Sequence, residues 1–301
     1  MGLCVYSFSK KILHLYSYTQ YLKSMKHLKF LVVALFVLMT SGIKAQTENV
    51  VIDGDHGKLQ AVIHKPALKQ GERVPMVVLC HGFMGNMQSG LLTKIAELLQ
   101  AQGIASIRFD FNGHGQSEGR FQDMTVLNEI VDAKKVIEYV SALPYVGSIG
   151  IAGHSQGGVV AAMTAGELGG DKIKAVALLA PAAVLRDDAI RGSTMGATYD
   201  PFNPGEYVEL FRGLKLGAEY IRTAFSMPIY ETSAGYNGPA IIIHGTGDRV
   251  VPYTYGERFH QIWPTSKLQI LDRADHGFSQ QIEQVATSTA EFLSQALLQS
   301  K

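Results

Sequence analysis

Short, continuous apolar runs alternate with amphipathic stretches along most of this 301-residue chain. The runs lie at residues 74–80, 105–110, 148–152, 175–180, 240–244 and 267–271. Apolar runs of this length, separated by helical patterns, are typical of parallel strands that helices cover on both faces. Before them, ENVVIDG and KLQAVIHKP are expected to pair as an antiparallel hairpin. The sequence therefore predicts an α/β protein with a mostly parallel central sheet.

Two of the intervening stretches have clear helical periodicity. LLTKIAELLQAQG (91–103) ends at a glycine, as helices commonly do. TVLNEIVDAKKVIEYV (125–140) places Leu127, Ile130, Val131 and Ile137 near one face, which we expect to be buried.

Residues 182–237 interrupt the alternation. This segment contains the turn-forming run DPFNPGE and five tyrosines. A long insertion in a compact domain is usually functional, so it is interpreted as a small cap over the C-terminal edge of the sheet, where open α/β folds bind ligands. No internal repeat or low-complexity linker is visible, which favours one domain over residues 46–301.

The N-terminal segment has the pattern of a secretory signal. From Met25 the chain reads MKHLKF, then ten apolar residues, then TSGIKAQ. This pattern predicts a signal peptide over residues 25–45, and residues 1–24 are interpreted as an extension upstream of the true start. A buried core helix and a retained membrane anchor are the alternatives. The expected protein is exported, periplasmic or secreted, with no stable membrane span after cleavage, because ten apolar residues are too few to cross a bilayer.

The charge distribution excludes some partners. Residues 1–45 hold six basic residues and no acidic one, so the remaining 21 basic and 26 acidic residues give residues 46–301 a charge of about −5. This sign argues against a nucleic-acid partner.

No cofactor is expected. No His/Cys pairs occur at ligand spacing, and the glycine-rich run DFNGHGQSEG (110–119) lacks the dinucleotide-binding spacing. Cys80 lies in an apolar run and is interpreted as a buried, inert thiol.

The run GHSQG (153–157) fits the pattern G-x-S-x-G. It lies between a predicted strand that ends at Ala152 and a predicted helix that begins near Gln156, which is the context of a nucleophile on a sharp turn. Taken alone, the run is equally compatible with a generic glycine turn.

A serine hydroxyl needs a base that an acid orients. Asp248 follows one late predicted strand and His276 follows the next, in the order Ser155, acid, histidine. Asp272 and Asp275 are rival acids, and we expect them to shape the histidine loop because they lie close to it in sequence.

An oxyanion also needs two backbone N–H donors. They are expected from Gln156, which follows the serine, and from Phe83 in the loop HGFMGN (81–86). The other histidines near these motifs, His81, His114, His154 and His244, are interpreted as structural.

With these residues, the chain resembles an α/β-hydrolase over residues 50–298. The runs DFNGHGQSEGRFQDMTVLNEIVDA, GHSQGGVVAAM, LLAPAA, MPIYETSA, HGTGDRVVP and ADHGFS look like those of the bacterial cinnamoyl (feruloyl) esterases. The resemblance implies hydrolysis of small-molecule hydroxycinnamate esters such as feruloyl, caffeoyl or coumaroyl esters, without a cofactor.

The same resemblance implies residues of the cap. Asp188 and Tyr220 align with an aspartate and a tyrosine that contact the phenolic ring in that family. Met195 stands where the family often has glutamine, so the preference for ring hydroxyls is expected to differ. A broader carboxylesterase, an acyl-peptide hydrolase and a non-catalytic binding protein on the same scaffold are the alternatives. The alcohol half of the substrate and the oligomeric state stay open.

Overall fold

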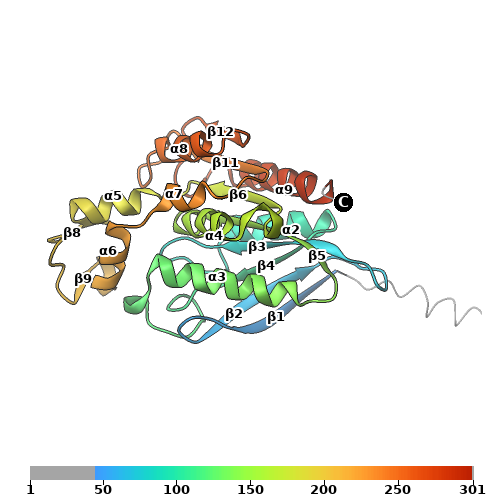
Figure 1. Ribbon diagram of the computed structural model, residues 1–301, viewed down its shortest axis with the longest axis horizontal. Coiled ribbons are helices and arrows are strands. Elements are labelled where there is room, and N and C mark those ends of the chain that lie inside the picture. Colours follow the sequence, from blue (N-terminus) through green and yellow to red (C-terminus); the bar gives the residue numbers. More distant parts are fainter. Residues whose placement is uncertain (1–44, 300–301) are drawn as a thin grey trace, which may run out of the picture. The chain divides into compact units, whose positions relative to one another are not determined.

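The computed structural model describes residues 45–299, and its main element is one eight-stranded sheet (Figure 1). The strands are β1 (Gln46–Asp53), β2 (Lys58–Lys65), β3 (Val74–Cys80), β4 (Ala105–Phe109), β5 (Val146–His154), β6 (Ala175–Leu179), β11 (Ala240–Gly245) and β12 (Lys267–Leu271). Their order across the sheet is β1-β2-β4-β3-β5-β6-β11-β12.

The sheet is parallel from β4 to β12, and only β2 runs against its neighbours β1 and β4. The predicted hairpin, the six predicted strands and the α/β fold class are therefore confirmed. The chain moves from β3 to β4 on one side and then crosses to β5 on the other. Ligands bind in open α/β sheets where the strand order reverses in this way, beyond the carboxyl ends of the strands.

Helices cover both faces of the sheet (Figure 1). On one face lie α3 (Val126–Ser141), α4 (Gln156–Lys172) and α8 (Thr254–Ile262), and on the other lie α2 (Gly90–Ala101) and α9 (Ile282–Leu298). An apolar core lies on each face of the sheet, and alternate residues of β3 pack into the two cores. Met76 and Val78 pack on the side of α3 and α4, whereas Val77 packs on the side of α2 and α9. Burial on both faces explains why the strands read as continuous apolar runs.

The predicted buried face of α3 is partly wrong. Ile130 and Ile137 are buried, but Leu127 is 44% exposed. The helix is rotated so that Glu129 and Asp132 face inward, and both are about 1% exposed. Their carboxylates accept hydrogen bonds from other segments, which allows polar side chains to take inward positions.

The segment between β6 and β11 forms a set of short elements. They are α5 (Val184–Arg191), β7 (Ser193–Thr194), β8 (Ala197–Thr198), β9 (Tyr207–Glu209), η2 (Phe211–Gly213), β10 (Lys215–Gly217), α6 (Ala218–Phe225) and α7 (Ile229–Ser233). Two close backbone approaches attach this segment to the rest. A Cβ at Gly217 would lie 2.1 Å from the carbonyl oxygen of Gln122 in η1 (Phe121–Asp123), and one at Gly166 of α4 would lie 2.0 Å from that of Thr232 in α7.

The predicted extension (1–24) and signal peptide (25–45) lie outside the described residues, except for Ala45. Across residues 45–299, no helix combines the length and the apolarity that a membrane crossing requires.

Candidate active site

Ser155 occupies the sharp turn between β5 and α4. Its backbone lies at φ 57° and ψ −124°, a region that residues with a side chain rarely adopt. The Ser155 amide donates to the carbonyl oxygen of Leu179 at 2.9 Å, which ties the turn to the end of β6. Such strain persists only where surrounding structure imposes it, and it is concentrated at functional sites.

The glycines on either side of Ser155 lie where a side chain would not fit. A Cβ at Gly153 would lie 2.0 Å from the carbonyl oxygen of Gly157, and one at Gly157 would lie 2.3 Å from that of His81. Gly158 packs against Pro181, with 3.0 Å between its would-be Cβ and the proline Cα. The glycines of the motif are therefore required by backbone approach.

A hydrogen-bonded chain links Ser155, His276 and Asp248. His276 Nε2 lies 2.9 Å from Ser155 Oγ, and His276 Nδ1 lies 2.7 Å from Asp248 Oδ2. With Nδ1–H donating to the carboxylate, the Nε2 lone pair is available to accept the serine proton. The three predicted residues come from the C-terminal ends of β5, β11 and β12 and meet at one edge of the sheet.

The carboxylate of Asp248 is fully buried and saturated with donors. Its Oδ1 accepts from the amides of Val250 and Val251, each at 2.8 Å. Burial alone would raise the pKa of Asp248, but hydrogen bonds from His244 and His276 outweigh this effect and hold the pKa well below its ordinary value. Asp248 therefore stays ionised.

The histidines interpreted as structural brace this site. His244 Nε2 lies 3.2 Å from Asp248 Oδ2 and 3.0 Å from the Val251 carbonyl oxygen, so His244 is a second imidazole on the same carboxylate. His154 Nε2 lies 2.8 Å from the His276 carbonyl oxygen. The rival acids lie elsewhere: Asp272 pairs with Arg273, and Asp275 accepts from the amide of Ser279.

The loop after β3 lies directly over the serine. A Cβ at Gly82 would lie 2.8 Å from Ser155 Cβ. Within residues 45–299, the amides of Phe83 and Gln156 have no hydrogen-bond acceptor, so both N–H groups are available to a ligand. His81 fixes this loop by donating from Nδ1 to the Gly82 carbonyl oxygen, while Nε2 accepts from the Phe111 amide. Burial lowers the pKa of His81 to about 4, which keeps the imidazole neutral.

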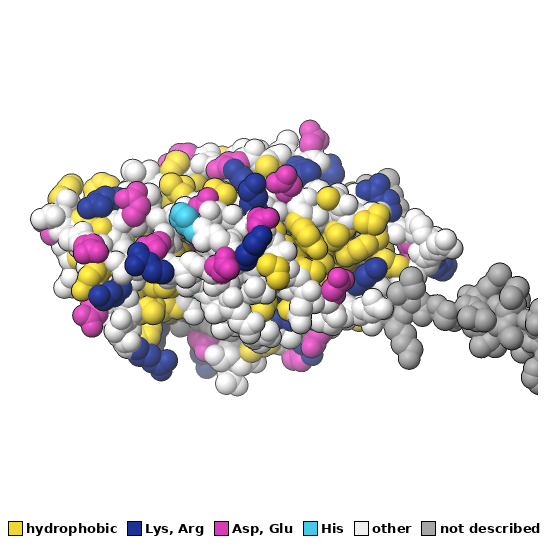
Figure 2. Space-filling view, turned by 90° about the horizontal axis from the view of Figure 1, so that it is seen from below, with side chains coloured by type: hydrophobic (Ala, Val, Ile, Leu, Met, Phe, Trp, Pro, Cys, Tyr) yellow, Lys and Arg dark blue, Asp and Glu magenta, His cyan; other side chains and the backbone are white. Residues whose placement is uncertain are grey.

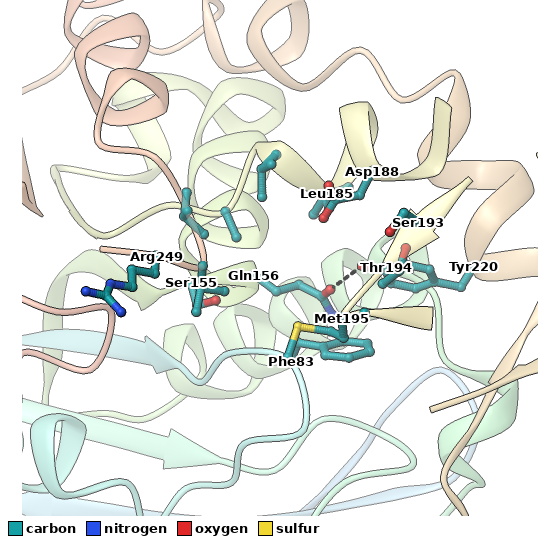
Figure 3. A pocket seen from close by; sticks show the side chains of 15 residues that line it. Phe83, Ser155, Gln156, Leu185, Asp188, Ser193, Thr194, Met195, Tyr220 and Arg249 are labelled. Carbon is teal, nitrogen blue, oxygen red and sulfur yellow. Dashed lines mark hydrogen bonds between the residues drawn. The ribbon is translucent and has the colours of Figure 1, made fainter. Parts of the chain in front are cut away.

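A pocket of about 370 Å³ opens at Ser155 (Figure 3). Its lining includes Phe83, Gln156, Leu185, Asp188, Ser193, Thr194, Met195, Tyr220, Arg249 and Val250. The predicted cap residues both line it. Asp188 pairs with Arg191, and burial raises the pKa of its carboxyl. The Tyr220 hydroxyl donates to Gln156 Oε1 at 2.8 Å.

The side chain of Gln156 also contacts the buried Glu129. Its Nε2 donates to Glu129 Oε2 at 2.9 Å, and Glu129 Oε1 has no hydrogen-bond partner in the described structure. Burial raises the pKa of Glu129 well above its ordinary value. The side chain of Gln156 thus joins helix α3 to the cap helix α6.

Glu129 and Arg249 were not predicted for this site, and His244 was interpreted as structural. Glu129 precedes the buried Ile130 on α3, but its charge argued for a surface position. His244 and Arg249 lie in the run HGTGDR around the predicted acid. No cluster of three or more potential metal ligands occurs in the described part of the chain.

The chain is similar to several known proteins. A family model described as serine aminopeptidase, S33, matches residues 71–199. The chain is 31% identical over 96 residues to the quorum-quenching protein AidA of Acinetobacter baumannii, covering 32% of this chain and 31% of AidA. It is 26% identical over 201 residues to human protein ABHD12B, covering 66% and 52%. The matches thus span about a third and about half of these relatives.

Two solved structures are similar over nearly their whole length. Est1E from Butyrivibrio proteoclasticus with ferulic acid bound is 31% identical, with a TM-score of 0.78, covering 83% of this chain and 99% of Est1E. The Pyrococcus furiosus esterase Pf2001 is 22% identical, with a TM-score of 0.62 and coverage of 84% and 94%, a likeness of fold alone. The chain is therefore a serine hydrolase of the α/β-hydrolase superfamily.

Proposed function

We propose that this protein is a serine esterase that hydrolyses hydroxycinnamate esters. The observation that carries the proposal is the series of hydrogen bonds from Ser155 Oγ through His276 to Asp248. Ser155 lines a pocket that also has aromatic side chains in its walls. The bound ferulic acid in the related Est1E structure supports an aromatic acid as the acyl half.

Acylation uses the hydrogen bonds that link Ser155, His276 and Asp248. His276 Nε2 takes the proton of Ser155 as Oγ attacks the ester carbonyl, and Asp248 stabilises the imidazolium through its bond to Nδ1. The amides of Phe83 and Gln156 stabilise the oxyanion. His276 then donates the proton to the departing alcohol, which leaves the acyl group on Ser155.

Deacylation repeats these steps with water. His276 takes a proton from the water molecule that attacks the acyl carbonyl, and it returns the proton to Ser155 Oγ as the carboxylic acid leaves. All proton transfers occur at Nε2, so the Nδ1–Asp248 bond holds one tautomer throughout.

The walls of the pocket suit a flat phenolic acyl group. Phe83 and Tyr220 lie with their ring centroids 5.7 Å apart and provide an aromatic wall. The far end is polar, where Asp188, Ser193 and Thr194 lie (Figure 3). We propose Asp188 and the oxygen of Tyr220 as acceptors for ring hydroxyls.

The test is replacement of the nucleophile. Ser155→Ala should reduce release of ferulate from methyl ferulate to the background rate and abolish labelling by a fluorophosphonate, with an unchanged circular dichroism spectrum. Ser141→Ala is the matched control, because Ser141 Oγ bonds only to the Ile137 carbonyl oxygen on α3. Retention of most activity by Ser155→Ala would refute the assignment.

A broader carboxylesterase is the second candidate. It is favoured by Met195, which lines the pocket, is 42% exposed and offers no hydrogen-bond donor for a specific ring substituent. Turnover of p-nitrophenyl acetate much faster than of methyl ferulate, compared as kcat/KM, would support this candidate.

We also propose that the protein is exported after cleavage following Ala45, on the strength of the charge and apolar pattern of residues 25–45. Intact-mass analysis of the natural protein should find Gln46 as its first residue.

A further inference from the structure

We infer that the alcohol half of the natural ester carries a carboxylate, which Arg249 binds at the mouth of the pocket. This inference rests on the proposed esterase function and adds the chemical class of the leaving group. Arg249 takes no part in the proposed acylation or deacylation.

Arg249 is the one cationic residue among those that line the pocket. Its guanidinium makes no hydrogen bond, ion pair or ring contact with any residue of the described range 45–299. By contrast, Arg191 near the far end of the pocket pairs with Asp188, so that end offers no free cation. The positive charge at the mouth is therefore available to a ligand.

Arg249 and the aromatic wall lie on opposite sides of the serine. In Figure 3, Arg249 lies to the left of Ser155, whereas Phe83, Tyr220 and Asp188 lie to its right. An ester bound at Ser155 extends in both directions from its carbonyl carbon. With the aromatic acyl group against Phe83 and Tyr220, the alcohol half extends toward Arg249.

The position of the base agrees with this orientation. His276 must reach the leaving oxygen to protonate it, so the alcohol lies on the side of the histidine. Arg249 directly follows Asp248, the acid that orients His276, and it therefore comes from the same side of the site. A substituent on the alcohol meets Arg249 before any other charged residue of the lining.

A carboxylate is the group that this cation fits best on small alcohols. The planar guanidinium can donate two parallel hydrogen bonds to a carboxylate, and Arg249 has all its donors free. The attraction is local, since residues 46–301 carry a net negative charge and acidic and basic side chains are interspersed on the face shown in Figure 2. Because the side chain is exposed, solvent screens the interaction and the expected effect is modest.

The experiment compares two ferulate esters that differ only in charge. One is the ester of glycolic acid, whose free carboxylate can meet Arg249, and the other is the ester of glycolamide, in which a neutral amide replaces it. The measured quantity is kcat/KM for the glycolate ester divided by kcat/KM for the glycolamide ester. This ratio should be about fivefold higher in the wild type than in Arg249→Gln, which is the scale of an exposed ion pair. Arg249→Lys should retain part of this preference.

The expected change is confined to kcat/KM for the anionic ester. Both esters give the same feruloyl-enzyme, so deacylation is common to them and a general defect cancels in the ratio of the two rates. Arg222→Gln is the charge-matched control, because Arg222 is an exposed cation of α6 outside the pocket lining. It should leave the ratio unchanged.

The outcomes separate the two proposals. An equal ratio in the wild type and Arg249→Gln, with ferulate released from both esters, would overturn the inference and leave the esterase proposal standing. Failure of the wild type to hydrolyse either ferulate ester, together with rapid hydrolysis of p-nitrophenyl acetate, would overturn the proposed acyl specificity instead. Loss of the preference at 1 M salt would further support an ionic contact.

Discussion

The Nε2 of His244 lies 3.2 Å from Oδ2 of Asp248, the same oxygen that accepts from His276 at 2.7 Å. His244 is fully buried, and a Cβ at Gly256 would lie 2.6 Å from its Nδ1. Its Nδ1 has no partner among the described residues, so the proton is held on Nε2, which donates to Asp248 and to the Val251 carbonyl oxygen. His244 thereby shares the charge that orients His276, the proposed base.

Replacing this imidazole should slow catalysis. In His244→Leu the carboxylate of Asp248 loses one of the donors that hold it against His276 Nδ1. Poorer orientation of His276 should lower kcat/KM on methyl ferulate about tenfold.

His244→Gln provides the matched variant, because its amide retains a donor near the same position. It should restore most of the rate. Wild-type kcat/KM in His244→Leu would show that His244 is only a packing residue.

A methyl group at position 82 should disable the oxyanion site. In Gly82→Ala the new Cβ would lie 2.8 Å from Ser155 Cβ and 3.1 Å from the His154 carbonyl oxygen, so the loop that carries the Phe83 amide must move away. Loss of one such donor costs on the order of 10²–10³ in kcat. The expected loss in kcat on methyl ferulate is of this size.

Gly90→Ala is the control for Gly82→Ala, because no atom lies within 4 Å of its would-be Cβ at the start of α2. It should retain wild-type kcat. Wild-type activity in Gly82→Ala would contradict the proposed role of this loop in binding the oxyanion at Ser155.

Local signals account for the parts of the molecule that could be predicted from the sequence. Continuous apolar runs mark strands that are buried on both faces, and each predicted strand is present. Ser155, Asp248 and His276 could be chosen because each follows a strand, and parallel strands bring their carboxyl ends to one edge. These signals are the order of the residues along the chain and the apolar runs of buried strands, and the sequence alone shows both.

Glu129 and Asp132 could not be predicted because their partners are distant in sequence. Glu129 meets Gln156 from α4, and Asp132 accepts from the amides of Asp55 and Asn112. Helical periodicity assigns charged residues to the surface unless such partners are known. The predicted buried face of α3 therefore excluded Glu129 and Asp132 and included Leu127, which is exposed. The same limit applied to Arg249, whose importance depends on what lies across the pocket.

The buried carboxyl of Glu129 should make stability depend on pH. Burial, reinforced by the charge of Asp132, raises its pKa in the folded protein. The folded state then holds a proton that the unfolded state releases above about pH 4.3, so this contribution is fully present below that pH and is lost as the pH rises through the folded pKa.

Glu129→Gln removes the group that loses stability at high pH, because an amide does not ionise. The amide oxygen of the new side chain can still accept from Gln156. The variant should melt on the order of 3 °C higher than the wild type at pH 8 and about equally at pH 4. Thermal unfolding followed by circular dichroism at both pH values measures the difference. A gap in melting temperature that does not widen with pH would contradict a buried, protonated carboxyl.

Removal of the Tyr220 hydroxyl should impair catalysis even on a substrate without ring hydroxyls. Tyr220 is 3% exposed, and its hydroxyl donates to Gln156 Oε1. In Tyr220→Phe the buried Gln156 oxygen is left without this donor, at a cost of about 1–3 kcal/mol. Because the Gln156 amide is one of the two proposed oxyanion donors, kcat/KM for methyl cinnamate should fall about fivefold.

Methyl coumarate, which adds one ring hydroxyl, separates the two roles of Tyr220. A further loss on this ester, beyond that on methyl cinnamate, would measure the proposed contact between Tyr220 and the ring. An unchanged rate on methyl cinnamate would instead contradict the positioning of Gln156 by Tyr220. Thr223→Val is the control on the same helix, since Thr223 Oγ1 donates only to the backbone of α6. It should leave both rates unchanged.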